Sequence, residues 1–263
     1  MTWSELVTRA QLLHERFESD GSLAWYRGHR CADWKLLSTG HRHILRVTDG
    51  AQAFETEAEQ ITLLRSELKT LYRKFQADAW QLLNETERSP WGVLFAMQHF
   101  GIPTRLMDWT ESFACAVFFA QLNRRRDQDA AIWVLDGQAL NHRALGENGL
   151  LSLGDDDTQD ARVNTRLWHP KWVPDEKAVP TVAAFPVFAN SRMVAQRSMF
   201  TVFGDTFKPL DEQFGGVLAH DERIVKITLP SELFDDAEEY LASAGLTAFN
   251  FYPDLQGLIP NGT

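Results

Sequence analysis

The first residue that could do chemistry is Arg27, which follows a short apolar run and precedes Gly28. An arginine at the end of a buried strand is costly unless its charge has an anionic partner. The planar guanidinium binds carboxylate or phosphate in bidentate fashion, and a neighbouring glycine lets a ligand approach the backbone. This pair therefore indicates an anion-binding site, with a structural ion pair to one of the 36 acidic residues as the alternative.

The residues around Arg27 are strongly basic, although the whole chain is acidic. The formal net charge is −10 and the isoelectric point is about 5.3. Between residues 25 and 46 Asp33 is the only acid, and the bases and histidines are Arg27, Arg30, Lys35, Arg42, Arg46, His29, His41 and His43. An acidic body repels nucleic acid over most of its surface. A local basic pocket suits a small anionic ligand better than a broad polyanion, and a solvated basic loop is the alternative.

A second group of polar residues lies in the middle of the chain, over 98–110. Gly101 and Pro103 predict that a helix ends there, and the apolar run over 112–122 predicts that another helix begins soon afterwards. The polar side chains between them would then lie at helix termini, where loops present them to solvent or ligand. We expect five of them to converge with Arg27 on one cleft, namely Gln98, His99, Thr104, Arg105 and Asp108.

Apolar periodicity predicts helices mainly in the amino-terminal half of the chain. The expected elements there are a helix over 3–18, a strand over 23–26, a long amphipathic helix over 54–82, a helix from Ser89 to Gly101 and a helix over 112–122. Ser89, followed by proline, is a favourable cap for the fourth of these. Asp108 or Thr110 would cap the fifth, because Asp108 and Glu111 have the spacing of a capping box.

The carboxyl-terminal half is richer in strand patterns. We expect strands over 131–135, 182–188, 199–203 and 224–229, a helix over 232–244 between Ser231 and Gly245, and an extended piece over 249–252. Helices gathered early and strands later favour an α+β fold with a mainly antiparallel, mixed sheet. No repeat or linker divides residues 1–263, which indicates a single domain.

Several classes of protein are disfavoured by what the sequence lacks. Two cysteines, Cys31 and Cys115, are too few for a disulfide scaffold and favour a reducing, cytoplasmic location. No apolar run is long enough to cross a bilayer, so no membrane partner is expected. No GxGxxG, P-loop or Gly-x-Ser-x-Gly pattern occurs. His41 and His43 have no fixed helical spacing and no cysteine partner, so no metal site is expected.

The two polar segments resemble the FRG domain, a bacterial family named for a Phe-Arg-Gly element that reads Tyr26-Arg27-Gly28 here. The family's Gln-His-x-Gly-x-Pro-Thr-Arg-Leu-Leu-Asp-Trp-Thr element matches residues 98–110, with Met107 in place of one leucine. Further matches are Trp34, Leu36-Leu37, Arg42, Asn190-Ser191-Arg192, Gln196 and 252–258, while Ser198 stands where the family usually has glycine. The resemblance spans residues 24–258.

A second resemblance links the Tyr-Arg-Gly element to arginine-type ADP-ribosyltransferases, and it implies a related fold. In those enzymes the arginine holds the phosphate or ribose of NAD, a Ser/Thr strand follows, and a later Glu or Gln element completes the site. The resemblance assigns these roles to Arg27, Thr104 and Gln196. The element around Gln196 has no Glu-x-Glu pair, so the catalytic carboxylate is expected to be Asp108 or Glu111.

The same resemblance implies the remainder of an NAD site and a reaction. The other residues expected to bind NAD are Tyr26, Gly28, Arg42, Gln98, Arg105 and Trp109, with His99 as a further catalytic candidate. Trp109 or Tyr26 would stack on the nicotinamide ring. NAD would be a substrate whose ADP-ribosyl group passes to a macromolecular acceptor, either nucleic acid, with RNA favoured over DNA, or protein. A toxin or antiphage effector of this kind implies a neutralising antitoxin protein as partner.

Two other functions stay open from the residues. One is a metal-independent ribonuclease toxin in which His99 or His43 acts as acid or base. The other is a non-catalytic module that binds a nucleotide or a partner protein. NAD consumption with label transfer, RNA cleavage without NAD, and binding without turnover distinguish the three.

Overall fold

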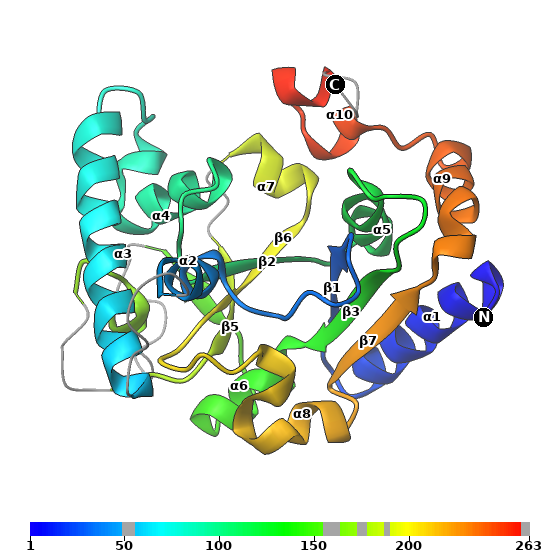
Figure 1. The fold of residues 1–263 in the computed structure, drawn as a ribbon, viewed down its shortest axis with the longest axis horizontal. Helices are drawn as coiled ribbons and strands as arrows, with labels where there is room; N and C mark the ends of the chain where they lie inside the picture. The colour runs from blue at the N-terminus through cyan, green and yellow to red at the C-terminus, as the bar shows by residue number, and fades with distance from the viewer. Residues whose placement is uncertain (49–55, 155–163, 173–177, 187–189, 259–263) are drawn as a thin grey trace.

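The computed structural model describes residues 1–48, 56–154, 164–172, 178–186 and 190–258. Its strands form one seven-stranded sheet in the order β4-β5-β6-β2-β1-β3-β7 (Figure 1). The strands are β1 (Ala24–His29), β2 (Leu106–Thr110), β3 (Ala130–Asp136), β4 (Leu151–Leu153), β5 (Val182–Pro186), β6 (Ser198–Val202) and β7 (Ile224–Leu229). Neighbouring strands are antiparallel, except that β4 and β5 are parallel. The predicted α+β fold with a mainly antiparallel, mixed sheet is confirmed.

The longest helices precede β3 in the chain, as predicted. The helices are α1 (Trp3–Ser19), α2 (Thr39–Thr48), α3 (Glu57–Ala79), α4 (Pro90–His99), α5 (Phe113–Gln121), α6 (Gly137–Leu145), α7 (Ser191–Ala195), α8 (Val217–His220), α9 (Phe234–Ser243) and α10 (Ala248–Phe251). Ser89 caps α4, with Pro90 in its first turn. None of the described helices is both long and apolar enough to cross a bilayer.

The segment before α5 differs from the prediction of a turn between two helices. Residues 106–110 form β2, and Ser112, rather than Asp108 or Thr110, caps α5 by accepting from the Cys115 N–H. The apparent capping box with Glu111 was therefore wrong. β2 lies inside the sheet and is covered on both faces, so its apolar residues do not alternate with polar ones, and its sequence lacks the usual strand signal.

Other predicted elements also changed. Residues 249–252, expected to be extended, are mostly helix α10, which Thr247 and Asn250 begin with a capping box. Ser231 does not cap α9, which follows a short 3-10 turn. Helix α2 was not predicted at all. The strand expected over 182–188 ends at Pro186, and residues 187–188 and 54 lie outside the described part of the chain.

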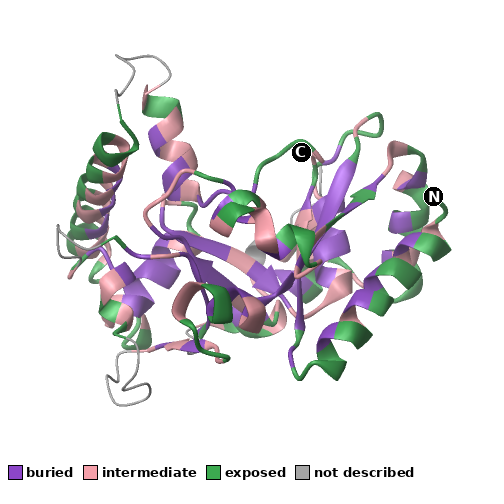
Figure 2. Cartoon of the chain, turned by 90° about the horizontal axis from the view of Figure 1, so that it is seen from below, coloured by how far each residue is buried: buried purple, intermediate pink, exposed green. Residues whose placement is uncertain are grey.

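The sheet is covered on both faces (Figure 2). One face packs against α6, α8 and a 3-10 turn over 210–216, with Trp25, Met107 and Trp133 at its centre. The opposite face has two separate cores. Helices α1, α5 and α9 cover the half that contains β3 and β7, whereas α3 and α4 cover the half that contains β5 and β6.

The two central strands of the sheet, β1 and β2, pair at fewer positions than either does with its other neighbour. β1 pairs with β3 at six positions and β2 pairs with β6 at five. β1 and β2 pair at one position, Tyr26 opposite Thr110. Beyond this pair the two strands diverge, and we call the space between them the fork. The fork separates the two cores of the opposite face.

Gly28 lies in the diverging part of β1, where α5 crosses the strand. A Cβ at this position would lie 2.0 Å from the carbonyl oxygen of Ala116 and 2.5 Å from the amide nitrogen of Ala120. The absent side chain therefore lets the helix contact the strand backbone directly. This contact fixes α5 beside the fork.

Gly28→Ala should force α5 away from β1, because the clashing atoms belong to the helix backbone. We expect the free energy of unfolding to fall by about 3 kcal/mol, the upper end for an overpacked site, in urea titrations. Gly21→Ala is the control, since Gly21 has φ +78° but a Cβ added there would meet no atom within 4 Å, and it should cost only about 1 kcal/mol. Equal losses in the two variants would contradict the close packing of α5 on β1.

Candidate functional site

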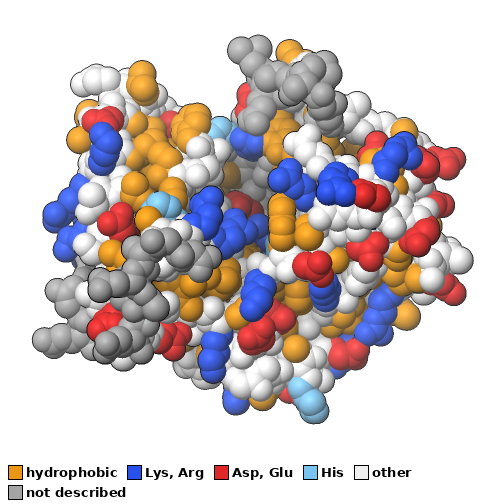
Figure 3. Space-filling view, in the orientation of Figure 1, with side chains coloured by type: hydrophobic (Ala, Val, Ile, Leu, Met, Phe, Trp, Pro, Cys, Tyr) orange, Lys and Arg blue, Asp and Glu red, His pale blue; other side chains and the backbone are white. Residues whose placement is uncertain are grey.

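A cavity of about 360 Å³ opens at the fork, between α4 and α5. Figure 3 shows arginine and lysine side chains around a hollow in the middle of the molecule. Its lining residues come from β1, β2, β6, α2, α4, α5, α7 and the loop after β1; they are Tyr26, Arg27, Gly28, His29, Arg30, Trp34, Arg42, Phe95, Gln98, His99, Asp108, Trp109, Thr110, Cys115, Phe119, Leu122, Asn190, Arg192, Met193, Gln196, Ser198 and Phe200.

The cavity is lined from both faces of the sheet. Successive strand residues point to opposite faces, so Arg27 and Trp109 belong to one face, and Tyr26, Asp108 and Thr110 belong to the other. A pocket on a continuous sheet would be lined from one face. The divergence of β1 and β2 is what brings both sets of side chains to one cavity.

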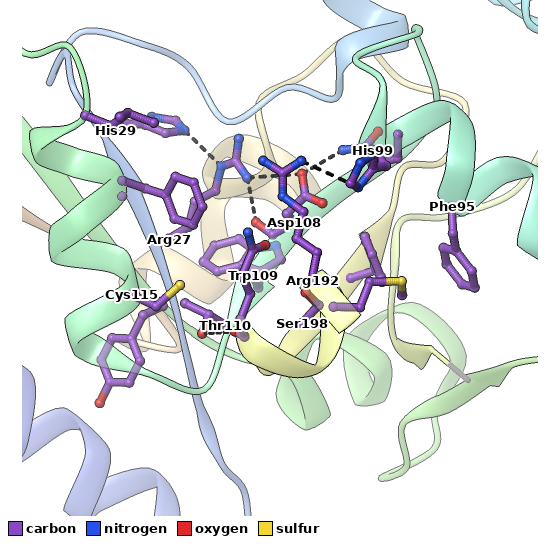
Figure 4. Close-up of a pocket in the computed structure, with 18 of the residues that line it drawn as sticks. Arg27, His29, Phe95, His99, Asp108, Trp109, Thr110, Cys115, Arg192 and Ser198 are labelled. Atoms are coloured by element: carbon purple, nitrogen blue, oxygen red, sulfur yellow. Dashed lines mark hydrogen bonds and ion pairs between the residues drawn. The ribbon is translucent and has the colours of Figure 1, made fainter. Parts of the chain in front are cut away.

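Arg27 spans the fork (Figure 4). Its Nη1 donates to the backbone oxygen of Asp108 at 2.5 Å and lies 3.9 Å from Oδ2 of the same residue. Its Nε donates to Nε2 of His29 at 3.0 Å. Burial lowers the pKa of Arg27 to about 10, with the Asp108 carboxylate opposing the change and Arg42 adding to it. The guanidinium is therefore charged at neutral pH and held in one orientation.

His29 supports Arg27 as a neutral ring. Its side chain is buried, and burial together with the charges of Arg27 and Arg42 lowers its pKa to about 3. Because Nε2 accepts from Arg27, it has no proton of its own. This histidine orients the arginine and has no proton to donate from Nε2.

Arg192 faces Arg27 from the other side of the cavity, on α7. Its guanidinium carbon lies 3.9 Å from the centre of the Tyr252 ring, and its Nη1 lies 3.5 Å from Nδ1 of His99. Burial lowers the pKa of Arg192, with Tyr252 and nearby acids opposing. Burial and the charge of Arg192 likewise lower the pKa of His99. At neutral pH His99 is therefore mainly uncharged.

Asp108 is the carboxylate among the described lining residues, and half of its side chain is exposed. Its Oδ2 accepts from Nε2 of Gln98 at 2.6 Å. Gln98 in turn accepts from the hydroxyl of Thr104 at 2.6 Å. Thr104 is itself buried and does not line the cavity, so it contacts the site through Gln98.

Two further candidates lie outside the cavity, Arg105 and Glu111. Arg105 is buried, donates to the backbone oxygens of Phe203 and Gly204, and pairs with Asp205 at 2.8 Å. These contacts tie β2 to the end of β6. Glu111 is half-buried, and its backbone N–H donates to Arg197.

The remaining candidates line the cavity with part of their polar groups already engaged. The amide nitrogen of Gln196 donates to the backbone oxygen of Phe251 at 2.9 Å, which fixes α10 beside α7. The indole N–H of Trp109 donates to Thr201. The hydroxyl of Tyr26 contacts His14, and burial raises its pKa to about 12. Gly28 and Arg42 also line the cavity.

Two further histidines of the basic stretch over residues 25–46, His41 and His43, lie outside the cavity. His41 is buried in α2 and bonds to Ser38 and to the backbone oxygen of Gly204. Within the described ranges, no group of three or more His, Cys, Asp or Glu side chains could hold a metal ion. His43 does not line the cavity.

The sequence alone assigned no role to several lining residues, above all Arg192, His29 and Ser198. Arg192 and Ser198 fall within the FRG-like pattern, and His29 falls within the basic stretch, so a signal for each was present. What was missing is their place in the fold. Ser198 lies opposite Thr110 on β6, and Arg192 reaches the site because α7 lies next to α10 and Tyr252.

The sheet and its cavity define the class of protein: an α+β domain with a cationic pocket between its two central strands. Residues 22–129 match the model of the FRG domain family. The match includes Arg27 and Asp108, whereas Arg192 and Gln196 lie beyond it. Neither a curated protein nor a solved structure matches the chain.

The ion pairs of Asp205 should make stability depend on pH. Burial raises the pKa of this nearly inaccessible carboxyl, but its bonds to Arg65 and Arg105 outweigh burial and lower the pKa overall. Stability from this group is therefore complete above the unfolded pKa, about 3.9, and is lost as pH falls through the lower folded pKa.

We expect Asp205→Asn to reduce the free energy of unfolding at pH 7 and to flatten its fall in acid, as measured by urea titration from pH 7 to pH 3. Asp127→Asn is the matched control, because Asp127 pairs with Arg125 on an exposed surface and such pairs contribute little. An unchanged acid profile in Asp205→Asn would show that the buried pair is not the source of the dependence.

Proposed function

We propose that this domain binds NAD at the fork and transfers its ADP-ribosyl group to a macromolecule. The observation that supports this most is the cluster of three guanidinium groups, Arg27, Arg42 and Arg192, around one carboxylate, Asp108. Together they leave an excess of positive charge in a partly buried cavity, which favours a ligand with a diphosphate. Aromatic side chains in the same wall suit the rings of a dinucleotide.

The reaction needs little machinery beyond this cluster. The bond between ribose C1′ and the nicotinamide nitrogen breaks, its electron pair stays on nitrogen, and neutral nicotinamide leaves. C1′ passes through an oxocarbenium-like state, as in glycoside hydrolysis. An acceptor oxygen or nitrogen then bonds to C1′ and releases its proton to solvent. The arginines would hold the diphosphate, and Asp108 would lie near the developing positive charge.

The ribonuclease alternative has weaker support from this cavity. General acid–base cleavage of RNA uses two groups that exchange protons near neutral pH. His29 has a pKa of about 3, and His43 does not line the cavity. His99 would have to act without a second histidine. A non-catalytic binding module would show NAD affinity without release of nicotinamide.

The acceptor we propose is nucleic acid, as expected of a toxin or antiphage effector. Arg30 and Arg46 are exposed near the cavity on a chain of net charge −10. A local basic rim can hold a single strand even when the rest of the surface repels it. The test therefore measures transfer to RNA, to DNA and to protein separately.

The direct test is incubation with NAD labelled in the adenylate phosphate, followed by measurement of released nicotinamide and of label in RNA, DNA and protein fractions. Arg27→Lys keeps the charge but loses the planar guanidinium and its bidentate hydrogen bonds, so the rate of transfer should fall roughly a hundredfold. Arg124→Lys is the matched control. Arg124 is a buried arginine that bonds to the backbone oxygens of Gln128, Leu229 and Pro230, away from the cavity. It should lose stability but keep turnover per folded molecule, and equal losses of turnover in both variants would contradict the proposal.

The acceptor class gives a separate prediction. If nucleic acid is the acceptor, the transfer rate should fall steeply as salt is added, because bound counterions are released when phosphates are neutralised. The hydrolysis of NAD by water, measured without acceptor, should change much less over the same range. Equal salt dependence of both reactions would contradict a nucleic acid acceptor.

A further inference from the structure

We infer that Asp108 is the carboxylate that receives a ribose hydroxyl of NAD, and that Thr104 and Gln98 are positioning residues that fix its orientation. The inference rests on the proposed function for the identity of the ligand. Its structural basis is a chain of hydrogen bonds from the backbone of β2 to the cavity, and each bond determines the direction of the next.

The chain begins at the backbone of Leu106. Its N–H donates to Oγ1 of Thr104 at 3.0 Å. Thr104 is 1% exposed, and its hydroxyl has a single hydrogen to donate. Oγ1 of Thr104 donates that hydrogen to Oε1 of Gln98 at 2.6 Å. The threonine therefore accepts from the backbone and donates toward the cavity.

The donor from Thr104 determines which way the Gln98 amide faces. An amide side chain can often be turned over without a visible change, so its orientation has to come from its partners. Here only the carbonyl oxygen can accept from Thr104. The amide nitrogen must then face Asp108, and it donates to Oδ2 at 2.6 Å.

Oδ2 of Asp108 is therefore engaged by the Gln98 amide, and Oδ1 is left to accept a hydrogen bond from a ligand. Oδ1 accepts no hydrogen bond from the described residues, and half of the side chain is exposed to the cavity. Arg27 approaches the same residue at its backbone oxygen. A ribose hydroxyl that donates to Oδ1 would therefore meet an oriented carboxylate beside the arginine that holds the phosphates.

The base of the chain is firmly held. The backbone N–H of Thr104 donates to Oγ1 of Thr39 at 3.0 Å, and its backbone oxygen accepts from the N–H of Gly40 at 2.7 Å. Both partners lie in the first turn of α2, the helix that also places Arg42 in the cavity. The same contacts thus position the carboxylate and one of its neighbouring arginines.

Three variants test the chain through NAD turnover. Thr104→Val removes the donor and should lower kcat by about tenfold to a hundredfold with KM for NAD little changed, since misplacement of a group affects turnover before binding. Thr104→Ser keeps the hydroxyl and should restore kcat. Thr181→Val is the matched control: Thr181 is equally buried and its Oγ1 accepts from the N–H of Gly204, but it is not linked to Asp108.

A second readout does not depend on turnover. The side-chain amide resonance of Gln98, assigned by its loss in Gln98→Met, should exchange slowly with water in the wild type and fast in Thr104→Val, but not in Thr181→Val. Wild-type protein without NAD turnover but with this pattern would overturn the proposed function and leave the hydrogen-bond chain standing. Normal kcat in Thr104→Val, or a Gln98 amide that exchanges equally in both threonine variants, would overturn the inference.

Discussion

The hydrogen bond from the Arg27 guanidinium to the backbone oxygen of Asp108 bridges the gap between β1 and β2. Beyond the Tyr26–Thr110 pair, toward Arg27 on β1 and Asp108 on β2, these central strands no longer pair, so the carbonyl of Asp108 lacks a strand partner there. A buried carbonyl left unpaired is costly. The arginine satisfies it while keeping the strands apart, which joins two half-sheets and leaves a cavity between them. The same residue therefore solves a problem of folding and creates the site.

The energetic cost of the site lies in its partly buried positive charges. Burial lowers the pKa values of Arg27, Arg42 and Arg192 together, and among the described lining residues Asp108 is the one carboxylate that opposes their charge. The fold limits this cost with a neutral His29 and with the Tyr252 ring under Arg192. An anionic ligand would relieve it. By contrast, Arg105 is matched by Asp205 within the protein, and this difference separates a structural arginine from the arginines of the cavity.

The sequence revealed the residues of the site better than their geometry. Arg27 and the segment over 98–110 are recognisable because their order along the chain is specific, and long periodic helices such as α1 and α3 follow from local pattern. β2 was missed because a strand covered on both faces has no alternation, and α10 because its aromatic residues imitate a strand. From the sequence alone, Thr104 and Arg105 cannot be distinguished from residues that bind a ligand. Their inward direction, and the approach of Arg192 from a distant helix, depend on packing that no local pattern contains.

Whether the fork between β1 and β2 is the NAD site can be decided by a crystal structure with a non-hydrolysable carbocyclic NAD analogue. We predict that the diphosphate lies within hydrogen-bonding distance of Arg27 and Arg192, and that a ribose hydroxyl lies on Oδ1 of Asp108. An analogue bound elsewhere on the protein, or no binding at saturating concentration while the apo structure keeps the cavity, would contradict the assignment of this site.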